Sequence, residues 1–205
     1  MYDLRRMDTP ELERESPLKH QIRSLAGFET GDGFAVGSID GRVAMETLGT
    51  SDEEKAKRFA FKCHRIKRDG TEVAYPINDI AFHPGCAIFF ILNTFPLCMT
   101  LRNHIRISQP PGSCFLCVSN RYGTFATAGA DGTINFWDGV AKKRLGRTDP
   151  YETSVAAIAF NHDGSLLAVA ASYTFEEGDK PHPADAVFVR PIADADVRPK
   201  AKKQA

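Results

Sequence analysis

The fold class of the chain can be inferred from residues 125–138, Phe125-Ala-Thr-Ala-Gly-Ala-Asp131-Gly132-Thr-Ile-Asn-Phe-Trp137-Asp138. Two short apolar runs flank an Asp-Gly pair, and both residues of such a pair adopt positive φ at low cost, as a tight hairpin turn requires. Apolar and polar residues alternate in the second run, which is typical of a strand with one buried face. The segment therefore predicts two antiparallel strands, the second of which ends in a Trp-Asp pair.

The same pattern recurs along the chain, which indicates a structure built from similar units. Two pairs of segments align with each other: residues 34–41 with 125–132, and residues 77–84 with 155–162. A further Asp-Gly pair, Asp163-Gly164, precedes another apolar run. No segment shows the sustained 3.6-residue period of a long helix, so we expect an all-β fold.

Units of this kind, with a Trp-Asp pair, are typical of WD40 β-propellers. The repeats predict three blades, at residues 20–64, 75–147 and 153–192. Met1 to Leu4 is expected to be the outer strand of a preceding blade, with Tyr2-Asp3 in place of Trp-Asp. Because propellers close with about four to eight blades, we expect an incomplete propeller.

The composition gives no reason to expect nucleic acid or membrane as a partner. Lys+Arg and Asp+Glu both total 26 among the 205 residues, so bulk electrostatic attraction to polyanions is not predicted. No N-terminal signal peptide is evident. The longest apolar run, Cys86 to Leu92, is far shorter than the roughly 20 residues of a membrane helix. We therefore expect an intracellular protein.

One segment interrupts the repeats and divides the chain. We expect residues 1–84 to hold the end of one blade, one full blade and the first strand of the next. Residues 85–121 form an anomalous insert, residues 122–192 the remainder of that blade and the last blade, and residues 193–205 a basic tail.

The insert contains four cysteines and no Asp or Glu, and three interpretations compete. Cys114-Phe-Leu-Cys117 resembles half of a zinc or redox site, but no second pair follows, and His104 is a poor substitute. A lineage-specific loop is a second interpretation, since propeller loops tolerate insertions. We favour a third, translated intron sequence, because the apolar stretch lies between two strands that a short turn could join.

Motifs of catalysis are missing from the sequence. We found no phosphate-binding Gly-rich loop followed by Lys, no His-Glu-x-x-His and no Gly-x-Ser-x-Gly. We therefore expect no enzyme activity, no cofactor, no metal and no small-molecule substrate. The charged cluster from Asp52 to Arg58 is interpreted as a solvated loop.

Several longer motifs resemble the Bub-type mitotic checkpoint WD proteins and the related Rae-type mRNA export factors. Both families resemble this chain at Arg14–Lys19, Ser38–Ala44, Phe59–Arg65 and Tyr75–Asn78. The Bub type is favoured by Lys142–Leu145, Tyr151–Ser154, His182–Arg190 and Arg198–Lys200. Rae-type proteins usually carry a Trp followed by a basic residue where this chain has Phe175-Glu176-Glu177. The resemblance covers nearly all of the chain except 85–121 and matches the second half of a seven-bladed propeller.

The resemblance implies a scaffold of the spindle assembly checkpoint in the nucleus, at the kinetochore. Such scaffolds hold helical docking motifs of checkpoint kinases, and they bind phosphorylated threonine motifs (MELT repeats) of a kinetochore scaffold protein. Two alternatives remain: a Rae-type adaptor of mRNA export and the nuclear pore, and a non-functional product of a truncated gene.

Arg23, Arg42 and Lys62 resemble the positions at which the family binds phosphothreonine. A phosphate carries about −1.5 to −2 charge at pH 7, and Arg forks hold it through charge-assisted hydrogen bonds. Arg42 follows the Asp40-Gly41 turn, so we expect the three side chains to converge at one edge of the propeller face. The alternative is that Arg42 and Lys62 are solvated strand residues.

Four further residues are candidates for docking a partner: His64, Arg65, Tyr173 and Phe175. His64 and Arg65 follow the same strand as Lys62, whereas the two aromatic residues lie in the long turn of the last blade. Alternatively, His64 forms a hydrogen bond within the propeller, and the aromatic residues pack on their own loop. For Asp131 we expect a structural role in its turn.

Overall fold

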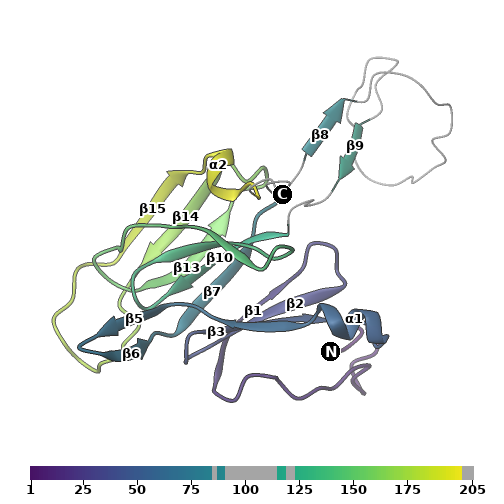
Figure 1. Ribbon diagram of the computed structural model, residues 1–205, viewed down its shortest axis with the longest axis horizontal. Coiled ribbons are helices and arrows are strands. Elements are labelled where there is room, and N and C mark those ends of the chain that lie inside the picture. Colours follow the sequence, from purple (N-terminus) through teal and green to yellow (C-terminus); the bar gives the residue numbers. More distant parts are fainter. Residues whose placement is uncertain (85–86, 91–114, 119–122, 200–205) are drawn as a thin grey trace.

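The structure is a computed structural model that describes residues 1–84, 87–90, 115–118 and 123–199 (Figure 1). Its first sheet is antiparallel and four-stranded, with the order β1-β2-β3-β4. Its strands are β1 (Ile22–Gly27), β2 (Gly33–Ser38), β3 (Arg42–Thr47) and β4 (Phe59–Lys62). This sheet corresponds to the first predicted blade.

The second and third sheets correspond to the other two predicted blades. The second has the order β12-β11-β10-β7, formed by β7 (Ile77–Phe82), β10 (Thr124–Gly129), β11 (Ile134–Asp138) and β12 (Lys143–Arg147). The third has the order β13-β14-β15, formed by β13 (Val155–Phe160), β14 (Leu166–Ala171) and β15 (Ala186–Pro191). The prediction of an all-β fold with three blades is confirmed.

The first strands of the three sheets lie side by side, with β7 between β1 and β13. Polar side chains connect them: Ser24 Oγ donates to Ile77 O at 3.2 Å, and Asn78 Nδ2 donates to Val155 O at 2.8 Å. These bonds hold neighbouring sheets in the radial arrangement of propeller blades.

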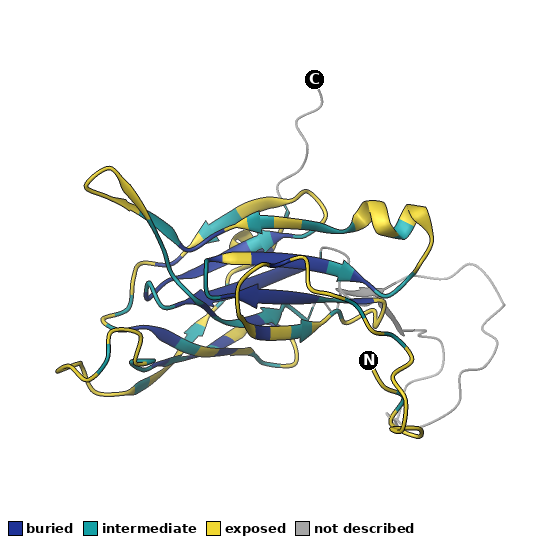
Figure 2. Ribbon diagram, turned by 90° about the horizontal axis from the view of Figure 1, so that it is seen from below, coloured by how far each residue is buried: buried dark blue, intermediate teal, exposed yellow. Residues whose placement is uncertain are grey.

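Apolar cores fill both spaces between the sheets. The first contains Ile77, Ile80 and Phe125, and the second contains Ile134 and Val169. Burying a side chain of this size contributes about 1.5–3 kcal/mol. Figure 2 shows the buried segments along the middle of the strands and the exposed ones in the connections at the ends.

Smaller elements lie between and beside the sheets. They are the hairpin β5 (Arg65–Arg68) and β6 (Thr71–Ala74), the paired strands β8 (Ala87–Phe90) and β9 (Phe115–Val118), and the helices α1 (Asp52–Lys57) and α2 (Asp194–Val197). In the described ranges, no helix has the length and apolar character needed to cross a membrane.

Three local expectations differ from the structure. Met1 to Leu4 forms no strand, because no strand among the described residues pairs with it, and Asp3 forms an isolated bridge with Arg6. The charged cluster expected to be a loop forms α1, since the side chain of Ser51 caps its start by accepting a bond from Glu54 N. The start of the expected tail forms α2, and its Val197 is buried.

The anomalous segment 85–121 lies mostly outside the described residues. Within it the structure describes only β8 and β9, which pair antiparallel as a separate two-stranded sheet. Cys86, Cys98 and Cys114 are among the residues that are not described. The interpretations of this segment as a zinc or redox site, a lineage-specific loop or translated intron sequence therefore stay predictions.

Candidate functional site

The predicted binding residues gather where several connections meet at one end of the sheets. Figure 1 shows the hairpin β5–β6 and the long connection between β14 and β15 at this end, and α1 and the pair β8–β9 at the other. The β2–β3 turn lies beside this hairpin, since Arg65 Nη2 donates to Asp40 O at 2.8 Å. We call this end the turn end.

Strand pairing brings two of the predicted phosphate-binding residues together. Arg42 is the first residue of β3 and lies directly opposite Lys62, the last residue of β4. Their side chains are 45% and 55% exposed. A left-handed turn precedes Arg42, since Gly41 has a φ of +68°. The prediction that these cations share one edge of the turn end agrees with this register.

Arg65 joins Arg42 and Lys62 through two shared carboxylates. Arg42 Nε lies 2.9 Å and Arg65 Nη2 3.6 Å from Asp40 Oδ2. Glu72 Oε2 lies 2.8 Å from Arg65 Nη1 and 3.9 Å from Lys62 Nζ. We call the three cations with Asp40 and Glu72 the basic strip. The hydrogen bond from Arg65 holds the pKa of the Glu72 carboxyl below its ordinary value, so this acid is ionised at neutral pH.

Arg23 lies at the same end of the first sheet but has a different partner. It is the second residue of β1, and its Nη2 lies 3.5 Å from Glu176 Oε1 of the β14–β15 connection. The structure therefore brings Arg42, Lys62 and Arg65 into one strip, whereas Arg23 faces the last sheet.

A groove of about 530 Å³ opens beside the basic strip. The hairpin β5–β6, the turn at Asp131 and the β14–β15 connection form its walls. Its aromatic lining consists of Tyr75, Tyr151 and Tyr173. Glu176, which pairs with Arg23, also lines the groove, so the Arg23–Glu176 ion pair lies at the edge of the groove.

The two aromatic docking candidates have different positions. The hydroxyl of Tyr173 donates to Gly178 O at 3.0 Å and accepts from Glu177 N at 2.8 Å, so this residue is a fixed wall of the groove. Phe175 does not line the groove and is 64% exposed, with a positive φ of 62°. Phe175 thus presents most of its ring to solvent.

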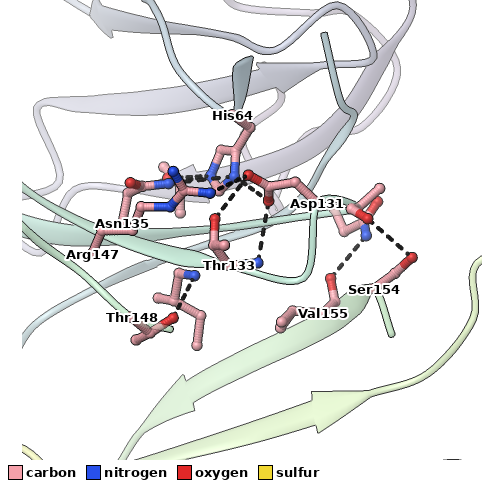
Figure 3. Close-up of polar contacts among 12 residues, drawn as sticks. His64, Asp131, Thr133, Asn135, Arg147, Thr148, Ser154 and Val155 are labelled. Atoms are coloured by element: carbon pink, nitrogen blue, oxygen red, sulfur yellow. Dashed lines mark hydrogen bonds and ion pairs between the residues drawn. The ribbon is translucent and has the colours of Figure 1, made fainter. Parts of the chain in front are cut away.

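His64 does not lie on the surface, so its expected docking role requires correction. Its side chain is fully buried, with Nδ1 2.8 Å from Asp131 Oδ1 and Nε2 2.8 Å from Thr127 Oγ1 (Figure 3). Trp137 Nε1 donates to the same Thr127 hydroxyl at 3.0 Å. A buried polar ring needs such partners, and this network places His64 inside the fold as a support of the groove.

Asp131 has the structural role expected of it. It accepts bonds from the backbone N and the hydroxyl of Thr133 at 3.2 and 2.8 Å, which close the β10–β11 turn. Burial raises the pKa of the Asp131 carboxyl, but the hydrogen bonds from His64 and Thr133 outweigh that effect and hold it below its ordinary value. The turn that lines the groove is therefore anchored by an ionised carboxylate.

Sequence reasoning identified the cations of the site but not their acidic partners. The sequence analysis places Asp40 in a turn and gives no role to Glu72. The spacing of Asp40 two residues before Arg42 was a local signal for an ion pair. Nothing in the sequence links Glu176 with Arg23, because Arg23 lies in the first sheet and Glu176 in a connection of the third.

No metal centre is found in the part of the chain that the structure describes. There, no three His, Cys, Asp or Glu side chains are grouped so that they could hold a metal ion. Cys114 and Cys117, the residues interpreted as half of a zinc or redox site, have side chains that the structure does not describe. A second hollow, of about 590 Å³, has Phe59, Phe82 and Lys142 in its lining and none of the predicted site residues.

Comparison with known proteins agrees with this architecture. A family model described as "WD domain, G-beta repeat" matches residues 96–138. The "Mitotic checkpoint protein BUB3.1" of Arabidopsis thaliana is 43% identical over 202 residues, which cover 98% of this chain and 49% of the relative. The "Mitotic checkpoint protein bub3" of Dictyostelium discoideum is 40% identical over 192 residues, which cover 94% and 47%.

A second group of relatives is more distant. The "Protein RAE1" of Arabidopsis thaliana is 33% identical over 206 residues, which cover 98% of this chain and 47% of the relative. The chain thus spans about half the length of the relatives it matches.

Proposed function

The chain is a WD-repeat protein of the Bub3 type, and on this premise we propose that it is a non-enzymatic scaffold of the spindle assembly checkpoint. We propose that its turn end binds phosphothreonine motifs of a kinetochore scaffold and helical docking motifs of checkpoint kinases. The observation that carries the proposal is the basic strip, where Arg42, Lys62 and Arg65 lie beside a preformed groove.

The chemistry of the strip suits a phosphate. Guanidinium groups present paired N–H donors that match phosphate oxygens, and a Lys ammonium adds a point charge. Arg42 and Lys62 are exposed and directly opposite each other, so one phosphate between the strands can contact both. Arg23 contributes from the far edge of the sheet once its pair with Glu176 opens.

The groove supports the second half of the proposal, the docking of a helical motif. It has a volume of about 530 Å³, its walls come from two different sheets and a hairpin, and it carries three tyrosines. Tyrosines supply large contact areas with a polar end and are enriched where proteins bind partners. Phe175, which is exposed, offers a further apolar contact. We propose the nucleus, and within it the kinetochore, as the place of action.

Calorimetry with a peptide containing Met-Glu-Leu-phosphothreonine tests this function. The protein should bind this peptide and not its unphosphorylated counterpart. Changing Arg23 and Arg42 to Ala should lower the affinity at least about a hundredfold, since each charge-assisted hydrogen bond contributes about 1.5–3 kcal/mol. Changing Arg5 and Lys55 to Ala removes the same charge elsewhere and should have no effect. Equal affinity for both peptides, or an unaffected Arg23→Ala, Arg42→Ala variant, contradicts the proposal.

A Rae-type adaptor of mRNA export is the second candidate, favoured by the match to the "Protein RAE1". Affinity purification of the protein from dividing cells separates the two. Recovery of checkpoint kinases supports the first function. Recovery of nuclear pore proteins without kinetochore proteins supports the second.

A further inference from the structure

Every cation of the basic strip has a carboxylate partner within the chain. Asp40 pairs with Arg42 at 2.9 Å and with Arg65 at 3.6 Å, and Glu72 pairs with Arg65 at 2.8 Å and with Lys62 at 3.9 Å. A bound phosphate would therefore meet two negative charges as well as three positive ones.

The two carboxylates are held in place by more than their ion pairs with the exposed cations. Arg65, whose side chain is 16% exposed, also donates to the backbone oxygen of Asp40 at 2.8 Å. The hydroxyl of Ser38 donates to the Asp40 carboxylate. Because Arg65 and Ser38 fix their positions, Asp40 and Glu72 remain near the strip when Arg42 and Lys62 turn toward a ligand.

The charge of Glu72 also persists over the ordinary pH range. The hydrogen bond from Arg65 lowers the pKa of Glu72, and the cations Lys62, Arg65 and Lys67 lower it further. The charged groups that act on the Glu72 carboxylate, Lys62, Arg65 and Lys67, are all cations. Arg65 pairs with both Glu72 and Asp40 and so lies between the two acids.

Fixed charges act on a ligand in proportion to the ligand's own charge. With both acids present, the positive potential at the strip is small, so an anion with one negative charge gains little on binding. A phosphate with about −1.5 to −2 charge gains roughly twice as much and adds three acceptor oxygens. We propose that Asp40 and Glu72 set the affinity of the strip for anions, holding it so low that a peptide must carry a dianionic phosphate to bind. This inference rests on the proposed phosphopeptide function and names two further residues that set the affinity of the strip for anions.

The test compares three peptides that differ only at the threonine of Met-Glu-Leu-Thr, with phosphothreonine, glutamate or threonine at that position. Calorimetry is performed on the full chain and on the variants Asp40→Asn, Glu72→Gln and their combination. The double variant should bind the phosphopeptide about tenfold more tightly and the glutamate peptide about threefold more tightly, in proportion to ligand charge. The threonine peptide should not change.

Asp52→Asn is the matched control, because it removes one negative charge from α1 at the opposite end, where Asp52 pairs with Lys55. It should leave all three affinities unchanged. Glu72→Gln on the exposed strand β6 serves as the second variant if Asp40→Asn disturbs the turn, and thermal melting of each variant reports the fold.

Each outcome is decisive. If the phosphopeptide binds with affinity that is unchanged or lowered in the Asp40→Asn and Glu72→Gln variants, the acids do not set the threshold and this inference is wrong, while the phosphopeptide function stands. If the phosphopeptide binds neither the original chain nor any variant, the proposed function itself fails.

Discussion

His64 Nδ1 lies 2.8 Å from Asp131 Oδ1, although the two residues belong to different sheets and are 67 positions apart. His64 follows the last strand of the first sheet, and Asp131 lies in a turn of the second. The bond therefore joins two blades directly beneath the groove. Because Asp131 and Gly132 line that groove, its shape depends on this buried contact.

Changing His64 to Ala should destabilise the protein by about 2–4 kcal/mol. The change removes the His64 bond to the buried Asp131 carboxylate, which keeps its bonds from Thr133, and removes a bond to Thr127. Urea unfolding measures the effect. His182→Ala is the control, because His182 is exposed and its replacement should lower the free energy of unfolding by less than about 0.5 kcal/mol. Equal stability of the two variants would show that the buried network contributes nothing.

The stabilising contribution of Asp131 should depend on pH in one direction. Its pKa in the folded protein lies below its ordinary value of 3.8, so the contribution is complete above pH 3.8 and is lost as the pH falls through the folded value. The difference in free energy of unfolding between the original chain and Asp131→Asn should be constant above about pH 5 and shrink below about pH 4. Unfolding curves from pH 6 to pH 3 measure it, and a difference that grows at acidic pH contradicts the assignment.

Strands and turns could be predicted because their signals are local. The Asp-Gly pairs at Asp40 and Asp131 do mark hairpin turns, although only the glycine of each pair has a positive φ and not both residues as expected. Two local signals were nevertheless missed. Ser51 and Glu54 form the start of a capped helix, and Asp69-Gly70 marks the turn of the hairpin β5–β6.

Two glycine variants should separate backbone strain from steric clash. Gly41 and Gly70 both have positive φ, of +68° and +80°. A Cβ on Gly41 would lie 2.6 Å from Cys63 O, whereas a Cβ on Gly70 meets nothing within 4 Å. Gly70→Ala should cost about 1–2 kcal/mol from strain alone, and Gly41→Ala distinctly more. Thermal melting measures both, and an equal loss would show that the β2–β3 turn has room for a side chain.

Cys63 should be unreactive in the native protein. Burial raises the pKa of its thiol far above the ordinary value, so the reactive thiolate is scarce at neutral pH. Brief treatment with iodoacetamide, followed by mass spectrometry of the peptide that contains Cys63, should show no modification until denaturant is added. Modification of this peptide under native conditions would place Cys63 at the surface.

The site could be predicted only in part from the sequence, for a physical reason. The sequence predicts Arg42 and Lys62 at one edge of the propeller face, and the pairing of β3 with β4 places the two residues opposite each other. For His64 the sequence leaves two interpretations open, partner docking and a hydrogen bond within the propeller, and the structure shows the second, because Asp131 and Thr127 of a separate sheet bond its ring. A contact between sheets leaves no local trace in the sequence.

The central claim is that the turn end, and not the opposite end, holds the phosphorylated partner. Hydrogen–deuterium exchange of the protein with and without saturating Met-Glu-Leu-phosphothreonine peptide tests this claim most directly. The account predicts slower exchange in residues 39–42 and 62–74, with no change in α1. Slower exchange confined to α1, or none anywhere while calorimetry records binding, would contradict it.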